Sequence, residues 1–343
     1  MAASPRTRVY LTVDVECAEE RIVGGALQPA MGYDLRVFGR LRNQRAALGL
    51  EHILDVWERH GHRATFYVES LGARSFGAEG LAEACALIRG RGHDVQMHAH
   101  PCQEDAYWRS GGRPRIADDL RAYDRAGQEA LLRRCRDALV ACGVPTASLV
   151  SFRAGNFAAD RDTWAAMAAL GLAISSNYDL GWRHRDALAQ PRPQAGLFAA
   201  GGGVWELPIT VFRQRLAGPR HLQIRACSAA ELLAALAAYH RAGVGDVTIV
   251  SHSFEFLHID SIEGRRGRPN TVTQARLATL AEFLAAARDR FEVLTVAELG
   301  RRLADGTVRP GAPVELARGS TRLRALRVLG QLYQRAQARL PLP

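Results

Sequence analysis

The chain has 343 residues, of which 48% are hydrophobic, with a formal net charge of +10 at pH 7 and a sequence pI of about 9.9. All of its basic side chains are arginine, and the absence of lysine excludes Schiff-base aldolase chemistry, lysine-anchored pyridoxal phosphate and a P-loop lysine. The basic charge makes a polyanion, either nucleic acid or an acidic membrane surface, a partner to be considered.

Short runs of β-branched and aromatic residues alternate with longer alanine- and leucine-rich segments of helical period. Strands are predicted over residues 9–15, 64–68, 94–98, 149–153, 173–176, 204–207, 247–251 and 291–294. Helices are predicted over residues 49–60, 80–91, 127–142, 161–170, 229–241 and 273–288. The alternation predicts an α/β fold: a distorted (β/α) barrel of seven or eight parallel strands in a catalytic domain over residues 1–304.

Two carboxylates end the first predicted strand, in the run Leu-Thr-Val-Asp-Val-Glu. Strand periodicity places Asp14 and Glu16 on the same side, at a carboxyl end where α/β active sites occur. Like charges this close repel each other unless a positive group lies beside them. A metal ion is the simplest such group, and two solvated carboxylates in a loop are the alternative.

The strand over residues 94–98 leads into two histidines with the same spacing. His98 and His100 can converge on one point before Pro101 ends the regular structure. Two neutral imidazoles and a carboxylate from a neighbouring strand form the ligand pattern of catalytic zinc, which keeps one position for water. The polar segment 104–125 that follows is predicted to form a rim loop over this site.

Two further predicted strands end in polar side chains. Arg153 follows an apolar run, and an arginine there can hold a carboxylate through paired hydrogen bonds. His252 ends the strand over residues 247–251, and together with the other strand ends it is a candidate catalytic histidine. Aromatic residues near the strand ends are candidates for stacking on sugar rings. These aromatic residues are Tyr107, Trp108, Tyr178, Trp182 and Trp205.

The character of the sequence changes after Leu303, and residues 305–343 are predicted to form a linker and a basic amphipathic tail. Residues 320–340 carry leucines at three- and four-residue steps among arginines, and no acidic residue follows Glu315. Such a helix fits peripheral contact with an anionic membrane; packing on its own domain and a solvated tail are the alternatives. The N-terminal residues show no signal-peptide pattern, and the scattered cysteines lack a CxxC pair, so a cytoplasmic location is expected.

The ordered set of strand ends resembles the polysaccharide deacetylases of carbohydrate esterase family four, whose domain is a distorted barrel. The resemblance covers about residues 8 to 303. The family's second motif is His-Ser-x-x-His, and His98 matches its first histidine. His100 takes the place of the second histidine, as in a subgroup of the family with His-x-His-Pro. Cys102 stands at the usual position of that histidine, which leaves Cys102 or Asp105 as alternative groups near the metal. The other matching segments are residues 12–16, 152–155, 175–179, 205–208, 252 and 291–295.

The resemblance implies a metal-dependent deacetylase that removes N-acetyl, or O-acetyl, groups from a saccharide, a glycan precursor or a lipid-linked sugar. Glu16, His98 and His100 are the predicted ligands of one divalent ion, Zn²⁺ being the first choice ahead of Co²⁺, Ni²⁺ or Mn²⁺. By the same resemblance Asp14 is the general base held by Arg153, and His252 is the catalytic acid. The spacing leaves open whether Asp14 and Glu16 exchange roles.

Three alternatives stay open at this stage. A degenerate site would make the chain a non-catalytic carbohydrate-binding protein at a membrane surface. An allantoinase-like relative would hydrolyse another non-peptide C–N bond. Nucleic-acid binding is disfavoured because the arginines are spread along the chain without a recognition motif.

Overall fold

The computed structural model describes most of the chain. The described residues are 5–23, 26–104, 118–182, 187–190, 194–215, 217–311 and 314–339. Most of the predicted rim loop lies outside them, as do Asp105, Tyr107 and Trp108, so the expectations for these residues stay predictions.

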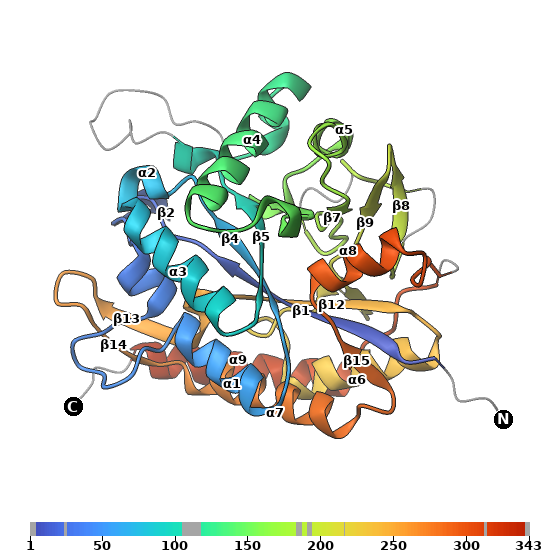
Figure 1. Cartoon of the computed structure of the whole chain (residues 1–343). Helices are drawn as coiled ribbons and strands as arrows, with labels where there is room; N and C mark the ends of the chain where they lie inside the picture. The colour runs from blue at the N-terminus through green and yellow to red at the C-terminus, as the bar shows by residue number, and fades with distance from the viewer. Residues whose placement is uncertain are drawn as a thin grey trace.

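All eight predicted strands are present, and they form one curled, mostly parallel sheet (Figure 1). The strand order is β12-β1-β4-β5-β6-β7-β9-β8, with β15 paired to the first part of β1 beside β4. Only β8 (Phe198–Gly201) is antiparallel to its neighbour. The parallel strands are β1 (Thr7–Val15), β4 (Thr65–Glu69), β5 (Asp94–Ala99), β6 (Ser151–Ala154), β7 (Ile174–Ser175), β9 (Val204–Glu206), β12 (Asp246–His252) and β15 (Phe291–Val293). The sheet with its surrounding helices is the expected distorted (β/α) barrel, curled into a half-barrel.

The six predicted helices are confirmed, with ends shifted by at most two residues. In the first of them, apolar residues recur at three- and four-residue steps, and Leu50, Ile53, Leu54 and Trp57 are buried as a result. The helices are α1 (Leu50–Arg59), α2 (Ala73–Phe76), α3 (Ala78–Gly90), α4 (Arg125–Ala141), α5 (Arg161–Ala169), α6 (Ala229–Arg241), α7 (Thr271–Ala286), α8 (Val296–Ala304) and α9 (Thr321–Arg339). Among the described residues, no helix combines the length and apolar character needed to cross a bilayer.

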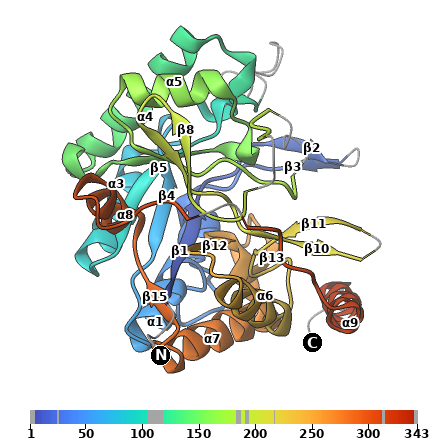
Figure 2. The same cartoon turned by 90° about the vertical axis from the view of Figure 1, so that its right-hand side faces the viewer.

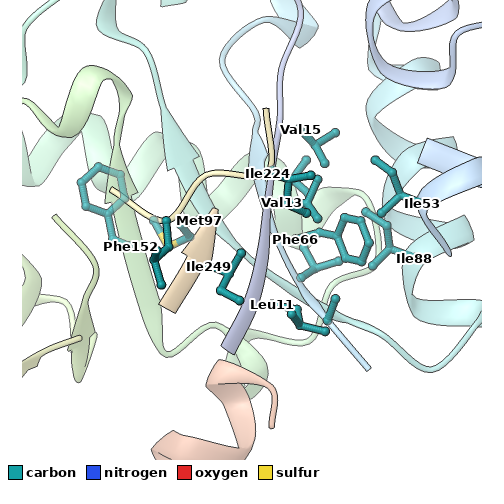
Figure 3. Close-up of a cluster of buried hydrophobic side chains, with 14 of the residues drawn as sticks. Leu11, Val13, Val15, Ile53, Phe66, Ile88, Met97, Phe152, Ile224 and Ile249 are labelled. Carbon is teal, nitrogen blue, oxygen red and sulfur yellow. The ribbon is translucent and has the colours of Figure 1, made fainter. Parts of the chain in front are cut away.

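The main hydrophobic core lies between the central strands and the helices. Figure 3 shows Leu11, Val13 and Val15 of β1 on one side of that strand. The same face of the sheet meets Ile53 of α1 and Ile88 of α3. Because successive strand residues alternate between faces, this packing turns the even-numbered residues of β1 to the opposite side. The core thereby fixes the direction in which the carboxylates at the end of β1 point.

The structure adds elements that the sequence analysis treated as loops. Three antiparallel hairpins leave the sheet, and Figure 2 shows β10–β11 projecting outward above α9. A short π-helix spans Tyr33–Phe38. The hairpins pair β2 (Arg21–Val23) with β3 (Ala26–Gln28), β10 (Val211–Gln214) with β11 (Ala217–His221), and β13 (Leu257–Ser261) with β14 (Arg266–Pro269). The connections after the strands are therefore structured, and several of them contribute side chains to the cavity described below.

Candidate metal-binding active site

The predicted metal ligands meet at the carboxyl end of β1 and β5. Val13 and Val15 are buried in the core, so Glu16 projects from the other side of the strand line. Glu16 Oε2 lies 2.6 Å from Nε2 of His100 and 3.4 Å from Nε2 of His98. Each of the three side chains offers one ligand atom, and these atoms lie within 4.8 Å of one another. The spacing of the two i, i+2 pairs therefore brings one carboxylate and two imidazoles to a common point.

Hydrogen bonds on the far side of each imidazole orient both rings. His98 Nδ1 lies 2.9 Å from the carbonyl oxygen of Arg153, which can only accept, so Nδ1 carries the proton. His100 Nδ1 lies 2.9 Å from Oδ2 of Asp118, which is itself held by the side-chain amide of Asn156 at 2.8 Å. Both rings thus turn Nε2 toward Glu16, in the arrangement of a metal-ligating histidine with a carbonyl or carboxylate behind it.

The electrostatics around Glu16 show that this point requires positive charge. Burial would raise the pKa of the Glu16 carboxyl, but the charge and hydrogen bond of His100 hold that pKa well below its usual value. Burial would lower the pKa of His100, but Asp118 and Glu16 on either side raise it well above its usual value. A proton on His100, or a divalent cation at this point, would compensate the two carboxylates. The donor set of two imidazoles and a carboxylate fits such an ion.

Asp14 occupies a separate position from the ligand group. Its Oδ1 accepts a hydrogen bond of 2.6 Å from Nη1 of Arg153, and both side chains are buried. The same guanidinium donates to Oγ1 of Thr12 at 3.1 Å and to Oγ of Ser176 at 3.0 Å, and it stacks on the ring of Tyr67. Arg153 is therefore locked in place by several partners, and it fixes one oxygen of Asp14.

His252 faces the other oxygen of Asp14. Its Nε2 lies 3.8 Å from Asp14 Oδ2, while its Nδ1 donates to Oε1 of Glu255 at 3.1 Å. The amide of Gln223 also donates to Glu255, so this carboxylate is held from two sides. Burial would lower the pKa of His252, but the hydrogen bond and charge of Glu255 raise it overall. The ring is thus oriented with Nε2 toward Asp14 and has an increased tendency to carry a second proton.

These groups line one cavity of about 500 Å³. Phe157, Trp182 and Phe254 supply aromatic walls, so the prediction that Trp182 lies near the site is confirmed. Tyr178 and Trp205 do not line the cavity: Tyr178 is buried against Phe198, and Trp205 belongs to β9 within the sheet. For these two residues the expectation of a sugar-stacking role is wrong, because strand pairing and core packing turn them away from the opening.

Segment 175–179 supports the site from behind rather than lining it. Ser176 binds Arg153, and the amide oxygen of Asn177 accepts from the backbone N–H of Ala154 at 2.7 Å. None of the five residues of this segment is among the cavity-lining residues. Its polar side chains instead fix the strand end that carries Arg153.

Four functional candidates in or behind the cavity wall were not predicted from the sequence. Arg36, from the π-helix, donates to Oε1 of Glu16 at 3.1 Å and lies over the ring of Phe254. The others come from connections after the strands or helices, where neither periodicity nor a motif marks them. Only Glu255, three residues after His252, carried a local signal in its proximity to a candidate histidine. Arg36, Asp118 and Gln223 line the cavity, and Glu255 lies behind His252.

The structure also places Cys102, the alternative metal neighbour. Its sulfur groups with Asp118 and the outer face of His100 rather than with Glu16 and His98. Burial raises the pKa of the Cys102 thiol well above its usual value. His100, not Cys102, therefore belongs to the group around Glu16.

Comparisons with known proteins bear on the fold. No protein-family profile and no curated protein sequence matches the chain. A solved structure of a protein assigned as a polysaccharide deacetylase from Mycobacterium smegmatis is 18% identical, with a TM-score of 0.54 over 92% of this chain and 96% of that one. A protein assigned as a glycoside hydrolase/deacetylase from Parabacteroides distasonis is 10% identical, with a TM-score of 0.55 over 92% of this chain and 75% of that one. At these identities the likeness establishes the shared fold.

Proposed function

We propose that the chain is a metal-dependent deacetylase of the polysaccharide deacetylase family, which hydrolyses the acetamide of an N-acetylated sugar. The observation that carries this proposal is the convergence of Glu16, His98 and His100 on one point beside Asp14 and His252, inside a single cavity. The likeness in fold to proteins assigned as deacetylases supports it.

Glu16, His98 and His100 would hold the ion, for which Zn²⁺ is our first choice. When bound, the ion would supply Lewis acidity that polarises a carbonyl group and favours the ionisation of water. His98 and His100 serve this purpose as neutral ligands, since each donates its Nδ1 proton to an oxygen behind it.

Asp14 acts as the general base. Its Oδ1 is held by Arg153, so the second oxygen, Oδ2, faces the cavity and can take a proton from the attacking water. Without Arg153 the carboxylate would be free to rotate, and it would lose its paired charge. In this assignment Glu16, which contacts both imidazoles, is the ligand, and Asp14 is the base.

His252 acts as the general acid. Glu255 holds its Nδ1, and its Nε2 lies close to Asp14, so Nε2 can donate a proton to the departing sugar nitrogen. Proton donation of this kind contributes roughly 10²–10⁴-fold in rate. One water is consumed: its oxygen bonds to the acetyl carbon, the C–N bond breaks, and acetate and a free amine leave.

The substrate class follows from the cavity. A volume of about 500 Å³ holds one or two sugar rings, and the flat faces of Trp182 and Phe157 can stack on them. We propose a glycan precursor or a lipid-linked sugar on the cytoplasmic side as the substrate, because the basic C-terminal helix suits an anionic membrane face.

The test is a substrate screen with the Zn²⁺-loaded protein. N-acetylglucosamine oligomers, nucleotide sugars carrying N-acetyl groups and linear amides are assayed for acetate and for ammonia. Acetate from an acetylated sugar is the expected product. Ammonia from a linear amide, with no acetate from any sugar, would instead favour an allantoinase-like hydrolase.

A further inference from the structure

The exposed large apolar side chains are concentrated on α9. Leu326, Leu329 and Leu332 expose 54%, 62% and 54% of their surface, and Val328 exposes 42%. Among the described residues, Val140 on α4 is the only other large apolar side chain in this class. Figure 2 shows α9 at the periphery of the molecule, below the β10–β11 hairpin. In the described part of the chain, a single helix at the edge of the fold thus carries all but one of the exposed large apolar side chains.

Buried polar contacts fix which side of α9 faces the protein. Arg327 is 4% exposed; its Nε lies 3.1 Å from the carboxylate of Glu231 on α6, and its Nη2 donates to Gln214 of β10 at 2.8 Å. At about 100° per residue, Leu326, Leu329 and Leu332 occupy an arc of roughly 120° centred on the side opposite Arg327. The leucines therefore form a continuous stripe directed away from the body of the protein, which we call the leucine face of α9.

Positive charge accompanies the leucine face. No acidic residue follows Glu315 in the sequence. Arg322 is exposed and falls within the same arc, and Arg324 lies at the edge of the helix with its guanidinium on the backbone oxygen of Arg215. An apolar stripe that includes an exposed arginine, on a helix without acidic residues, has the composition that favours the interface of an anionic bilayer.

We propose that the leucine face of α9 docks on an anionic lipid surface, with the leucines in the acyl boundary and the arginines among the headgroups. A second copy of this chain is the competing occupant, but a symmetric contact would bring Arg322 of each copy against a surface of like charge. In an anionic bilayer the acyl chains can bury the leucines, and the negatively charged headgroups can pair with the arginine.

The helix that carries the leucine face, α9, is connected to the cavity wall through β10–β11. The backbone N–H of Gly319 donates to Arg213 of β10 at 2.7 Å, and Arg327 binds Gln214 of the same strand. The partner strand β11 ends at His221, which lines the cavity. A membrane bound at α9 would thus be held in a fixed relation to the site. The proposal stands on the surface of α9 and does not depend on the reaction proposed above.

The experiment measures binding of the full chain to vesicles by co-sedimentation. Vesicles of phosphatidylcholine alone are compared with vesicles containing about 30 mol% phosphatidylglycerol. The variant Leu326→Gln/Leu329→Gln/Leu332→Gln removes the apolar stripe, and Val140→Gln is the matched control on α4. Deleting α9 is avoided, because that would leave Glu231 buried without Arg327.

We expect binding to the anionic vesicles, weaker binding to the neutral ones, and a loss of at least about tenfold in affinity in the triple variant with none in Val140→Gln. Arg322→Gln should weaken anionic binding by about fivefold and leave neutral binding unchanged. The circular dichroism of each variant should match that of the unmodified chain. Failure of the unmodified chain to bind anionic vesicles, or equal binding by the triple variant, would overturn the proposal. A concentration-dependent dimer that the triple variant abolishes, without vesicle binding, would assign the face to a second copy instead.

Discussion

Arg153 Nη1 lies 2.6 Å from Asp14 Oδ1, at the centre of a network in which both side chains are buried. The two residues are 139 positions apart in the sequence and come from strands that are not neighbours in the sheet. The inward-facing side of the curled sheet brings them together. The pair links the stability of the fold to the orientation of the proposed general base.

Replacing Arg153 by leucine should lower the free energy of unfolding by about 3 kcal/mol at pH 7, because it leaves the Asp14 carboxylate buried without its partner. In the double variant Arg153→Leu/Asp14→Asn, part of that loss should be recovered, since no isolated charge remains. Urea denaturation of the single and double variants measures both effects. Simple additivity of the two single losses would contradict a direct coupling of the pair.

Glu255→Gln should alter the pH dependence of turnover. Glu255 raises the pKa of His252, so the glutamine variant should have a lower His252 pKa than the unmodified chain. The general acid works only when protonated, and activity is lost as the pH rises through this pKa. The alkaline limb of the kcat profile should therefore move to lower pH. Glu263→Gln, at an exposed position, is the control. If it moves the alkaline limb by the same amount, the effect cannot be assigned to the contact between Glu255 and His252.

Asp118→Asn should weaken metal binding about 10- to 100-fold, because Asp118 accepts the Nδ1 proton of His100 and so orients this ligand. Titration of the metal-free protein with Zn²⁺ measures the affinity. Asp137→Asn on the exposed face of α4 is the matched substitution and should bind Zn²⁺ like the unmodified chain. If Asp118→Asn also binds with unchanged affinity, Asp118 has no part in positioning His100.

Gly155→Ala should disturb the site more than the fold. A Cβ at Gly155 would overlap the imidazole of His100, and the ring would have to leave the position facing Glu16. Gly90→Ala, where a Cβ meets nothing within 4 Å, is the control. We expect Gly155→Ala to lose Zn²⁺ affinity while Gly90→Ala keeps it, with both proteins folded by circular dichroism. Normal Zn²⁺ binding by Gly155→Ala would show that the ring can move without consequence.

The regular elements were predictable because buried parallel strands are continuous β-branched runs and the helices that cover them have apolar stripes. The β10–β11 and β13–β14 hairpins were missed for the opposite reason. Their second strands, Ala217–His221 and Arg266–Pro269, are rich in arginine, glycine and proline, and no two-residue hairpin turn signal separates the paired strands. Local composition there favours a loop, and only the tertiary contacts select a strand.

The site residues also divide into those that could be predicted from the sequence and those that could not. Asp14, Glu16, His98 and His100 could be grouped from the sequence because parallel strands end at one edge of the sheet. Asp118 could not, because it lies 18 residues beyond His100, within the segment that was predicted only as a rim loop. Arg36 and Gln223 likewise reach the cavity, and Glu255 reaches His252, through connections whose paths depend on the packed fold.

The most direct measurement for the whole account is the Zn²⁺ content of the purified, Zn²⁺-saturated protein, taken together with acetate release. The unmodified chain should hold one equivalent, and His98→Ala should hold almost none. Asp14→Asn should hold one equivalent and release no acetate, since Asp14 is assigned as a base and not as a ligand. Loss of Zn²⁺ in Asp14→Asn would exchange the roles of the two carboxylates. Retention of a full equivalent by His98→Ala would contradict a metal centre built on β1 and β5.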